Sequence, residues 1–139
     1  MGCYDALPYG TRACLIIAIL EKRLGLKFSQ CDIYLNVVGG LKLDEPSVDL
    51  ALALALISSI KDIPVPQNVI AMGELGLAGE CRAISDLQKR ISESYRLGFT
   101  TIAIPQKSDR KKLKIPKDVS VIDVRSVFDA LTLFKKDEQ

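Results

Sequence analysis

The chain has 139 residues, of which 48% are hydrophobic and 26% charged, and its formal net charge is +2. This length and balance suit one globular domain with a single core, and they exclude the disordered, collagen-like and low-complexity classes. The longest apolar runs, at 13–20 and 50–57, are far shorter than the roughly 20 residues that cross a bilayer, and the N-terminus does not resemble a secretion signal. We therefore expect a soluble, cytoplasmic protein.

The chain has four scattered cysteines and no histidine. None of the cysteines forms a C-x-x-C pair, so we do not expect a transition-metal site. Two of the four lie inside predicted apolar segments, where a reduced cysteine behaves as a small hydrophobe. The lack of histidine also excludes Ser-His-Asp and Cys-His catalytic groups, which leaves only a lysine or a carboxylate as a general base.

The N-terminal part predicts a linker, a helix and a strand. Residues 1–10 have no periodicity, and we expect a disordered or truncated linker there. A helix capped at or near Thr11 continues through an apolar stretch until Gly25 ends it. Residues 31–38 alternate apolar and polar side chains, which is the period of a half-buried strand.

The segment 44–62 predicts the central helix of the fold. Its acidic first residues, including Glu45, can accept from the free amides of a first turn, and Pro46 suits the first helical position. Ser47 then falls in that turn, where we expect its hydroxyl to be presented. The apolar run at 50–57 makes the helix hydrophobic on every side, so other elements should enclose it.

The second half of the chain predicts further strands separated by helices. Residues 69–75 read as one strand that turns through Leu-Ala-Gly into Glu-Cys-Arg-Ala-Ile to form a hairpin, and short strands are expected at 100–105 and 119–124. We expect an α+β or mixed α/β fold with one mixed sheet packed with helices, spanning residues 11–135 and followed by a tail at 136–139.

Two helices should follow serine caps in this half. Ser85 and Gln88 fit a capping box, with Leu87, Ile91 and Tyr95 on the inner face of the helix and Gly98 at its end. Ser126 should cap the last helix, whose inward residues are Val127, Leu131 and Phe134.

Three stretches of the sequence carry a family resemblance. They are EKRLGL with DIYLNVVGGLKLDEPSVDLALALAL, then GELGLAGECRAISDLQKR, then RLGFTTIAIP. They closely resemble the C-terminal domain of the RadA family of bacterial DNA repair proteins, also called Sms, a domain that is similar to the proteolytic domain of Lon proteases. The resemblance implies a ribosomal protein S5 domain 2-like fold, a homo-hexameric ring, and work on branched DNA in homologous recombination beside RecA recombinase.

The resemblance also implies that the chain is a fragment. Whole members of the family carry an N-terminal zinc-binding ribbon and a RecA-like ATPase core, and this sequence has neither a C-x-x-C pair nor a glycine-rich phosphate loop. We therefore expect no cofactor in this chain, with ATP, Mg and Zn confined to the missing N-terminal part.

Active Lon proteases use a serine in D-G-P-S-A-G and a lysine in G-G-L-K-E-K. By resemblance, Ser47 stands at the nucleophile position, whereas Gln88 holds the position of the general-base lysine. A neutral amide cannot take a proton from serine, so we expect no catalytic residue and only vestigial positions. Lys89 should point to solvent, and Glu45 and Asp49 add bulk and charge beside the serine. A residual Ser-Lys peptidase that uses Ser47 and Lys89 remains the alternative.

Positive charge is concentrated between residues 105 and 117. This stretch, the basic segment, has a net charge of +5 in a chain of +2, so the other residues sum to −3. Such a flexible basic loop suits phosphate binding, and with no aromatic residue among the lysines it favours a duplex backbone over unpaired bases. The alternatives are a solvated loop, or an oligomerisation scaffold without DNA contact. The candidate DNA-binding residues are Lys107, Arg110, Lys111, Lys112, Lys114 and Lys117.

Overall fold

A computed structural model of the protein describes residues 8–28, 45–108 and 110–135. The strand expected at 31–38 and the tail at 136–139 lie outside these ranges. The described elements, in chain order, are α1 (Pro8–Leu24), η1 (Pro46–Val48), α2 (Asp49–Lys61), β1 (Val69–Ala71), β2 (Glu74–Leu75), β3 (Cys81–Arg82), α3 (Leu87–Arg96), β4 (Thr101–Pro105), η2 (Arg110–Lys112), β5 (Ser120–Val124) and α4 (Val127–Lys135).

The described strands form two sheets. Strands β1, β4 and β5 lie side by side in that order and are all parallel, while β2 and β3 form a separate antiparallel hairpin. The mixed helix and strand content with a parallel sheet fits the expected α+β class. The expectation of one mixed sheet is wrong for the described residues, because the two strand directions occur in different sheets.

The split between β1 and β2 corrects the predicted strand at 69–75. At Gly73 the backbone leaves the sheet, since its N–H donates to the carbonyl oxygen of Ser47 at 3.0 Å and its own carbonyl accepts from the Leu50 N–H at 3.1 Å. A Cβ at this glycine would lie 2.7 Å from the Cys81 sulfur. The absent side chain therefore leaves room for Cys81 of the hairpin, while the backbone hydrogen bonds of Gly73 tie the strand end to the start of α2, and the predicted hairpin begins only beyond it.

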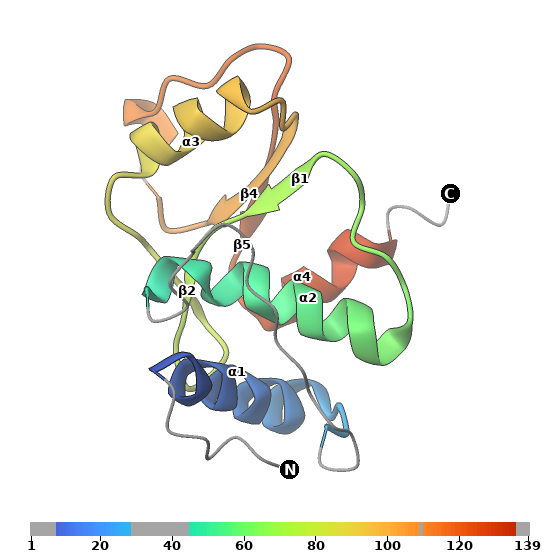
Figure 1. Ribbon diagram of the computed structural model, residues 1–139. Helices are drawn as coiled ribbons and strands as arrows, with labels where there is room; N and C mark the ends of the chain where they lie inside the picture. The colour runs from blue at the N-terminus through green and yellow to red at the C-terminus, as the bar shows by residue number, and fades with distance from the viewer. Residues whose placement is uncertain (1–7, 29–44, 109, 136–139) are drawn as a thin grey trace.

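The two faces of the parallel sheet belong to different apolar clusters. Ala103 of β4 faces the larger cluster, which α1, α2 and α4 cover, whereas its neighbours Ile102 and Ile104 face a smaller cluster with Leu87 and Ile91 of α3. This alternation follows from the two-residue period of a strand. Figure 1 shows α3 on one side of the sheet and the other three helices on the opposite side.

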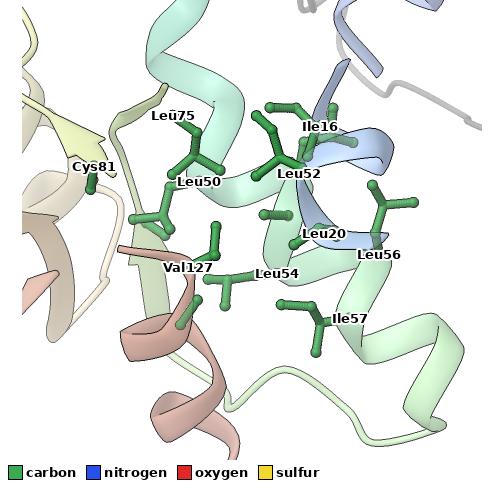
Figure 2. Close-up of a cluster of buried hydrophobic side chains, with 14 of the residues drawn as sticks. Ile16, Leu20, Leu50, Leu52, Leu54, Leu56, Ile57, Leu75, Cys81 and Val127 are labelled. Atoms are coloured by element: carbon green, nitrogen blue, oxygen red, sulfur yellow. The ribbon is translucent and has the colours of Figure 1, made fainter. Parts of the chain in front are cut away.

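Helix α2 lies at the centre of the larger cluster. Its leucines and Ile57 contact Ile16 and Leu20 of α1 and Val127 of α4, as Figure 2 shows. Each fully buried leucine contributes about 2 kcal/mol to the free energy of unfolding. Within the apolar run 50–57 the predicted enclosure is confirmed except at two exposed small residues, Ala51 and Ala55.

Helix α1 starts earlier than the sequence indicated. It begins at Pro8, so residues 8–10 are helical and not part of a linker, and Thr11 lies inside the helix and does not cap it. Proline suits a first helical turn because its missing N–H would have no partner there. Among the described residues, no helix is long and apolar enough to span a bilayer.

Of the two predicted serine caps, the structure confirms one and contradicts the other. At α4 the cap is confirmed, because the Ser126 hydroxyl oxygen accepts from the Phe128 N–H at 3.3 Å. At α3 the capping box is wrong: Asp86 occupies the cap position with a φ of 56° and makes no side-chain cap hydrogen bond. The inner face of α3 ends with Ser94, and Tyr95 is 41% exposed where we expected it to be buried.

Candidate functional site

Ser47, the position of the Lon nucleophile, lies in the η1 turn before α2. Its side chain is only 6% exposed, so the expected presentation of the hydroxyl to solvent is wrong. The hydroxyl donates to Oε1 of Glu45 at 2.7 Å. Burial follows from the fold, because the β1–β2 junction at Gly73 binds the Ser47 carbonyl oxygen and covers the turn.

Glu45 links this turn to α3. Its Oε1 atom also accepts from Nη2 of Arg90 at 2.6 Å. The hydrogen bond from Ser47 and the Arg90 guanidinium both lower the pKa of Glu45. The Glu45 carboxylate, which accepts the hydrogen bond from the Ser47 hydroxyl, is therefore stabilised in its charged form, and this makes it a weaker base.

We expected Asp49 to add negative charge where a substrate would approach Ser47, and the structure shows that it does not. It is fully buried, and its carboxylate accepts from both Nε and Nη2 of Arg12 and, at 3.0 Å, from the Leu75 N–H. The same contact raises the pKa of Arg12. Asp49 thus joins α1, the start of α2 and β2, which is a structural role.

Gln88 does not take part in a cap of α3, and its side chain contacts the basic segment. Its Oε1 accepts from the Lys114 N–H at 2.6 Å, and its Nε2 donates to the Lys114 carbonyl oxygen at 3.1 Å. It also donates to the Ser92 hydroxyl at 3.3 Å. Gln88, at the position of the general-base lysine, is therefore hydrogen-bonded to the backbone of Lys114, which lies 26 residues further along the chain.

Lys89, the base of the alternative peptidase reading, is exposed on α3. The cation of α3 that reaches the Ser47 turn is Arg90, through Glu45. A guanidinium has no acceptor atom and keeps its proton at any ordinary pH, so Arg90 cannot serve as the base.

The basic segment is anchored at several points, which differs from the expected flexible loop. The Leu113 side chain packs on the smaller cluster beneath α3, and Lys114 is held by Gln88. Arg110 in η2 donates to Oδ2 of Asp123 on β5 at 2.9 Å. Residues far apart in sequence, on α3 and β5, therefore fix the backbone that carries the basic side chains.

The candidate DNA-binding side chains are all exposed. The short helix η2, which carries three of them, lies beside the start of α3 (Figure 1). Arg110 forms an ion pair with Asp123. This pair contributes little, because both side chains are partly exposed to solvent. The exposed residues are Lys107, Arg110, Lys111, Lys112, Lys114 and Lys117.

Sequence reasoning missed the long-range pairs of the site, among them Arg12 with Asp49, Glu45 with Arg90, and Gln88 with Lys114. A signal existed for Asp49, because an acid in the first turn of a helix predicted to be enclosed needs a cation. Nothing in the local sequence identifies the partners of Glu45 and Gln88.

No group of acidic or cysteine side chains that could hold a metal ion occurs in the part of the chain that the structure describes. The two cysteines in that part, Cys14 and Cys81, do not form a disulfide, and burial raises the pKa of Cys81 to about 12.

Comparison with known proteins finds one matching family model, the Lon protease (S16) C-terminal proteolytic domain, over residues 16–132. Similar relatives are the DNA repair protein RadA of Listeria monocytogenes, 47% identical over 84% of this chain, and that of Streptococcus pneumoniae, 46% identical over 86%. The DNA repair protein RadA of Escherichia coli is 41% identical over 88%.

The matched regions are 25%, 28% and 26% of these three relatives, so the chain spans about a quarter of their length. The family model, by contrast, covers most of this chain and includes Ser47 and Gln88. The protein therefore belongs to the family of Lon protease C-terminal proteolytic domains, in a form similar to the one found in bacterial RadA proteins.

Proposed function

We propose that this protein is a non-catalytic Lon-like domain of a RadA-type DNA repair protein, and that it binds duplex or branched DNA through the basic segment. The observation that carries the proposal is the anchoring of a net +5 segment on the α3 side of a domain whose other residues sum to −3. Relatives named as DNA repair proteins support the same direction.

The chemistry of the segment suits a phosphate backbone. Lysine and arginine that neutralise phosphates release counterions, so affinity should fall steeply with salt. The backbone of Lys114 is hydrogen-bonded while its ammonium stays exposed, and Lys111 is exposed one turn earlier. Contacts of this kind position a duplex without reading its sequence.

Charge reversal of Lys111, Lys112 and Lys114 to glutamate tests the DNA proposal. We expect weaker binding of a fluorescent duplex and a salt slope reduced by roughly two to three, since each lost phosphate contact removes about 0.9 from the slope. Fluorescence anisotropy at several salt concentrations measures both quantities.

A matched control separates the segment from net charge. Three exposed lysines outside the basic segment are reversed in the same way, which gives the same total charge; they are Lys22, Lys27 and Lys61. Equal binding by the two triple variants would mean that the basic segment is not the contact.

We also propose that the domain has no peptidase activity. The Ser47 hydroxyl donates to Glu45, whose pKa is lowered by Ser47 and Arg90, and Gln88 is committed to Lys114. A serine needs a base that takes its proton near neutral pH. A serine-directed phosphonate should leave the protein unlabelled, and labelling that is lost in Ser47→Ala would establish the alternative Ser-Lys peptidase.

The remaining parts of the proposal rest on the family resemblance. They are a ribosomal protein S5 domain 2-like fold, assembly into a homo-hexameric ring, action in homologous recombination beside RecA recombinase, and a cytoplasmic location. ATP, Mg and Zn would be bound by other parts of a longer protein. Gel filtration with light scattering tests the ring, and a ring that retains no DNA at low salt would favour a pure oligomerisation scaffold.

A further inference from the structure

The side chain of Gln88 pairs with the backbone of one residue of the basic segment, Lys114. Its amide oxygen accepts from the Lys114 N–H at 2.6 Å and its amide nitrogen donates to the Lys114 carbonyl oxygen at 3.1 Å. The two hydrogen bonds together fix both the distance and the orientation of the Lys114 backbone. Gln88 is itself held on α3 by a hydrogen bond to Ser92, at 3.3 Å.

The neighbouring anchors leave Lys114 dependent on this contact. Leu113 packs on the apolar cluster and its N–H donates to the carbonyl oxygen of Arg110 at 3.1 Å, which closes the η2 turn just before Lys114. Gln88 then sets the direction in which the chain leaves that turn. Its amide therefore determines how the exposed Lys114 is placed relative to Lys111 and to Lys89, which follows Gln88 on α3.

We propose that Gln88 is a positioning residue for nucleic-acid binding, and that its amide holds the basic segment in the arrangement that meets the phosphates. This inference rests on the proposed DNA binding and assigns a use to the residue at the general-base position. A backbone segment that is already ordered loses less conformational freedom on binding, so pre-ordering raises affinity without adding a contact.

The size of the effect follows from the number of hydrogen bonds. Two neutral hydrogen bonds of ordinary strength order the segment, and their loss should weaken duplex binding by about five- to tenfold. The salt slope should be unchanged, because every lysine and arginine is still present. Loss of affinity with an unchanged slope distinguishes positioning from direct phosphate contact.

The experiment compares Gln88→Met, which keeps the length of the side chain and removes the amide, with the original 139-residue chain. Gln88→Glu is a second variant, since it keeps an acceptor for the Lys114 N–H and lacks the donor. Gln106→Ala, at an exposed glutamine near the start of the basic segment, is the matched control. Amide hydrogen exchange by NMR reports on Lys114 and on the β4 core, and anisotropy reports duplex affinity and its salt slope.

We expect Lys114 exchange to be fastest in Gln88→Met and intermediate in Gln88→Glu, with β4 protection unchanged. Duplex affinity should fall in Gln88→Met and stay unchanged in Gln106→Ala. Unchanged Lys114 exchange, or faster exchange with full affinity, would overturn the inference, as would equal loss of protection in β4. If the triple lysine reversal leaves affinity unchanged, the proposed DNA binding itself fails, and the exchange data still decide whether Gln88 orders the segment.

Discussion

Substitution of Arg12 by methionine should destabilise the fold strongly. The Asp49 carboxylate is 0% exposed, and its partners are the Arg12 guanidinium and the Leu75 N–H. Methionine keeps most of the apolar length of arginine and removes the charge. The variant therefore leaves a buried carboxylate with one backbone donor and without its cation.

The expected cost can be worked out from the geometry. Breaking a buried ion pair by removing one partner costs about 3–5 kcal/mol, because the remaining charge stays desolvated. The Arg12 side chain is 21% exposed, so water can partly replace it, and the Leu75 hydrogen bond remains. We therefore expect a loss at the lower end, about 3 kcal/mol in the free energy of unfolding.

Urea unfolding followed by circular dichroism measures this loss, and a double variant tests its cause. If the cost arises from the unpaired charge, adding Asp49→Asn to Arg12→Met should recover about 1–2 kcal/mol, because the neutral amide still accepts from Leu75. A loss below about 1 kcal/mol in the single variant, or further destabilisation in the double variant, would refute the reasoning.

Three smaller effects follow from other contacts. Glu45→Gln should lower the free energy of unfolding by at most about 0.5 kcal/mol at pH 7, since the pair with Arg90 is half exposed. Because folding lowers the pKa of Glu45 from 4.5, the difference between the two proteins should disappear as the pH falls from 4.5 through the lowered value. Urea titrations at pH 7 and at a pH below the lowered pKa measure this. Cys81 should react with iodoacetamide only through unfolding, since burial raises its pKa to about 12, and peptide mass spectrometry in native and denaturing buffer checks it. Gly73→Ala should cost about 1–3 kcal/mol in thermal unfolding, because its Cβ would lie 2.7 Å from the Cys81 sulfur.

Local signals predicted structure well where the partners were also local. Ser126 caps α4 as expected because its acceptor and the Phe128 N–H lie two residues apart. Ser85 and Gln88 show a similar pattern, yet no box forms there, because the backbone of Lys114 offers Gln88 two hydrogen bonds in place of one. A capping signal therefore fails where a distant partner satisfies the same side chain better.

Features that depend on contacts between distant segments could not be predicted from periodicity. The apolar period of 69–75 is that of a single strand, and only the packing of Gly73 on the start of α2 divides it. The same holds for the site, since the separation of Arg12 and Asp49 in sequence is 37 residues and that of Glu45 and Arg90 is 45. The types of residue at the site could be predicted from the sequence, and their partners could not.

Helix α3 connects the two halves of the proposal. Arg90 reaches the Ser47 turn through Glu45, and Gln88 reaches the basic segment at Lys114. An amide can give one donor and one acceptor to the backbone of the same residue, whereas a lysine ammonium has donors only and would leave the Lys114 N–H without its partner. A glutamine at position 88 is therefore chemically suited to holding the basic segment and unsuited to activating a serine, so the proposed absence of peptidase chemistry and the proposed DNA surface share one physical cause.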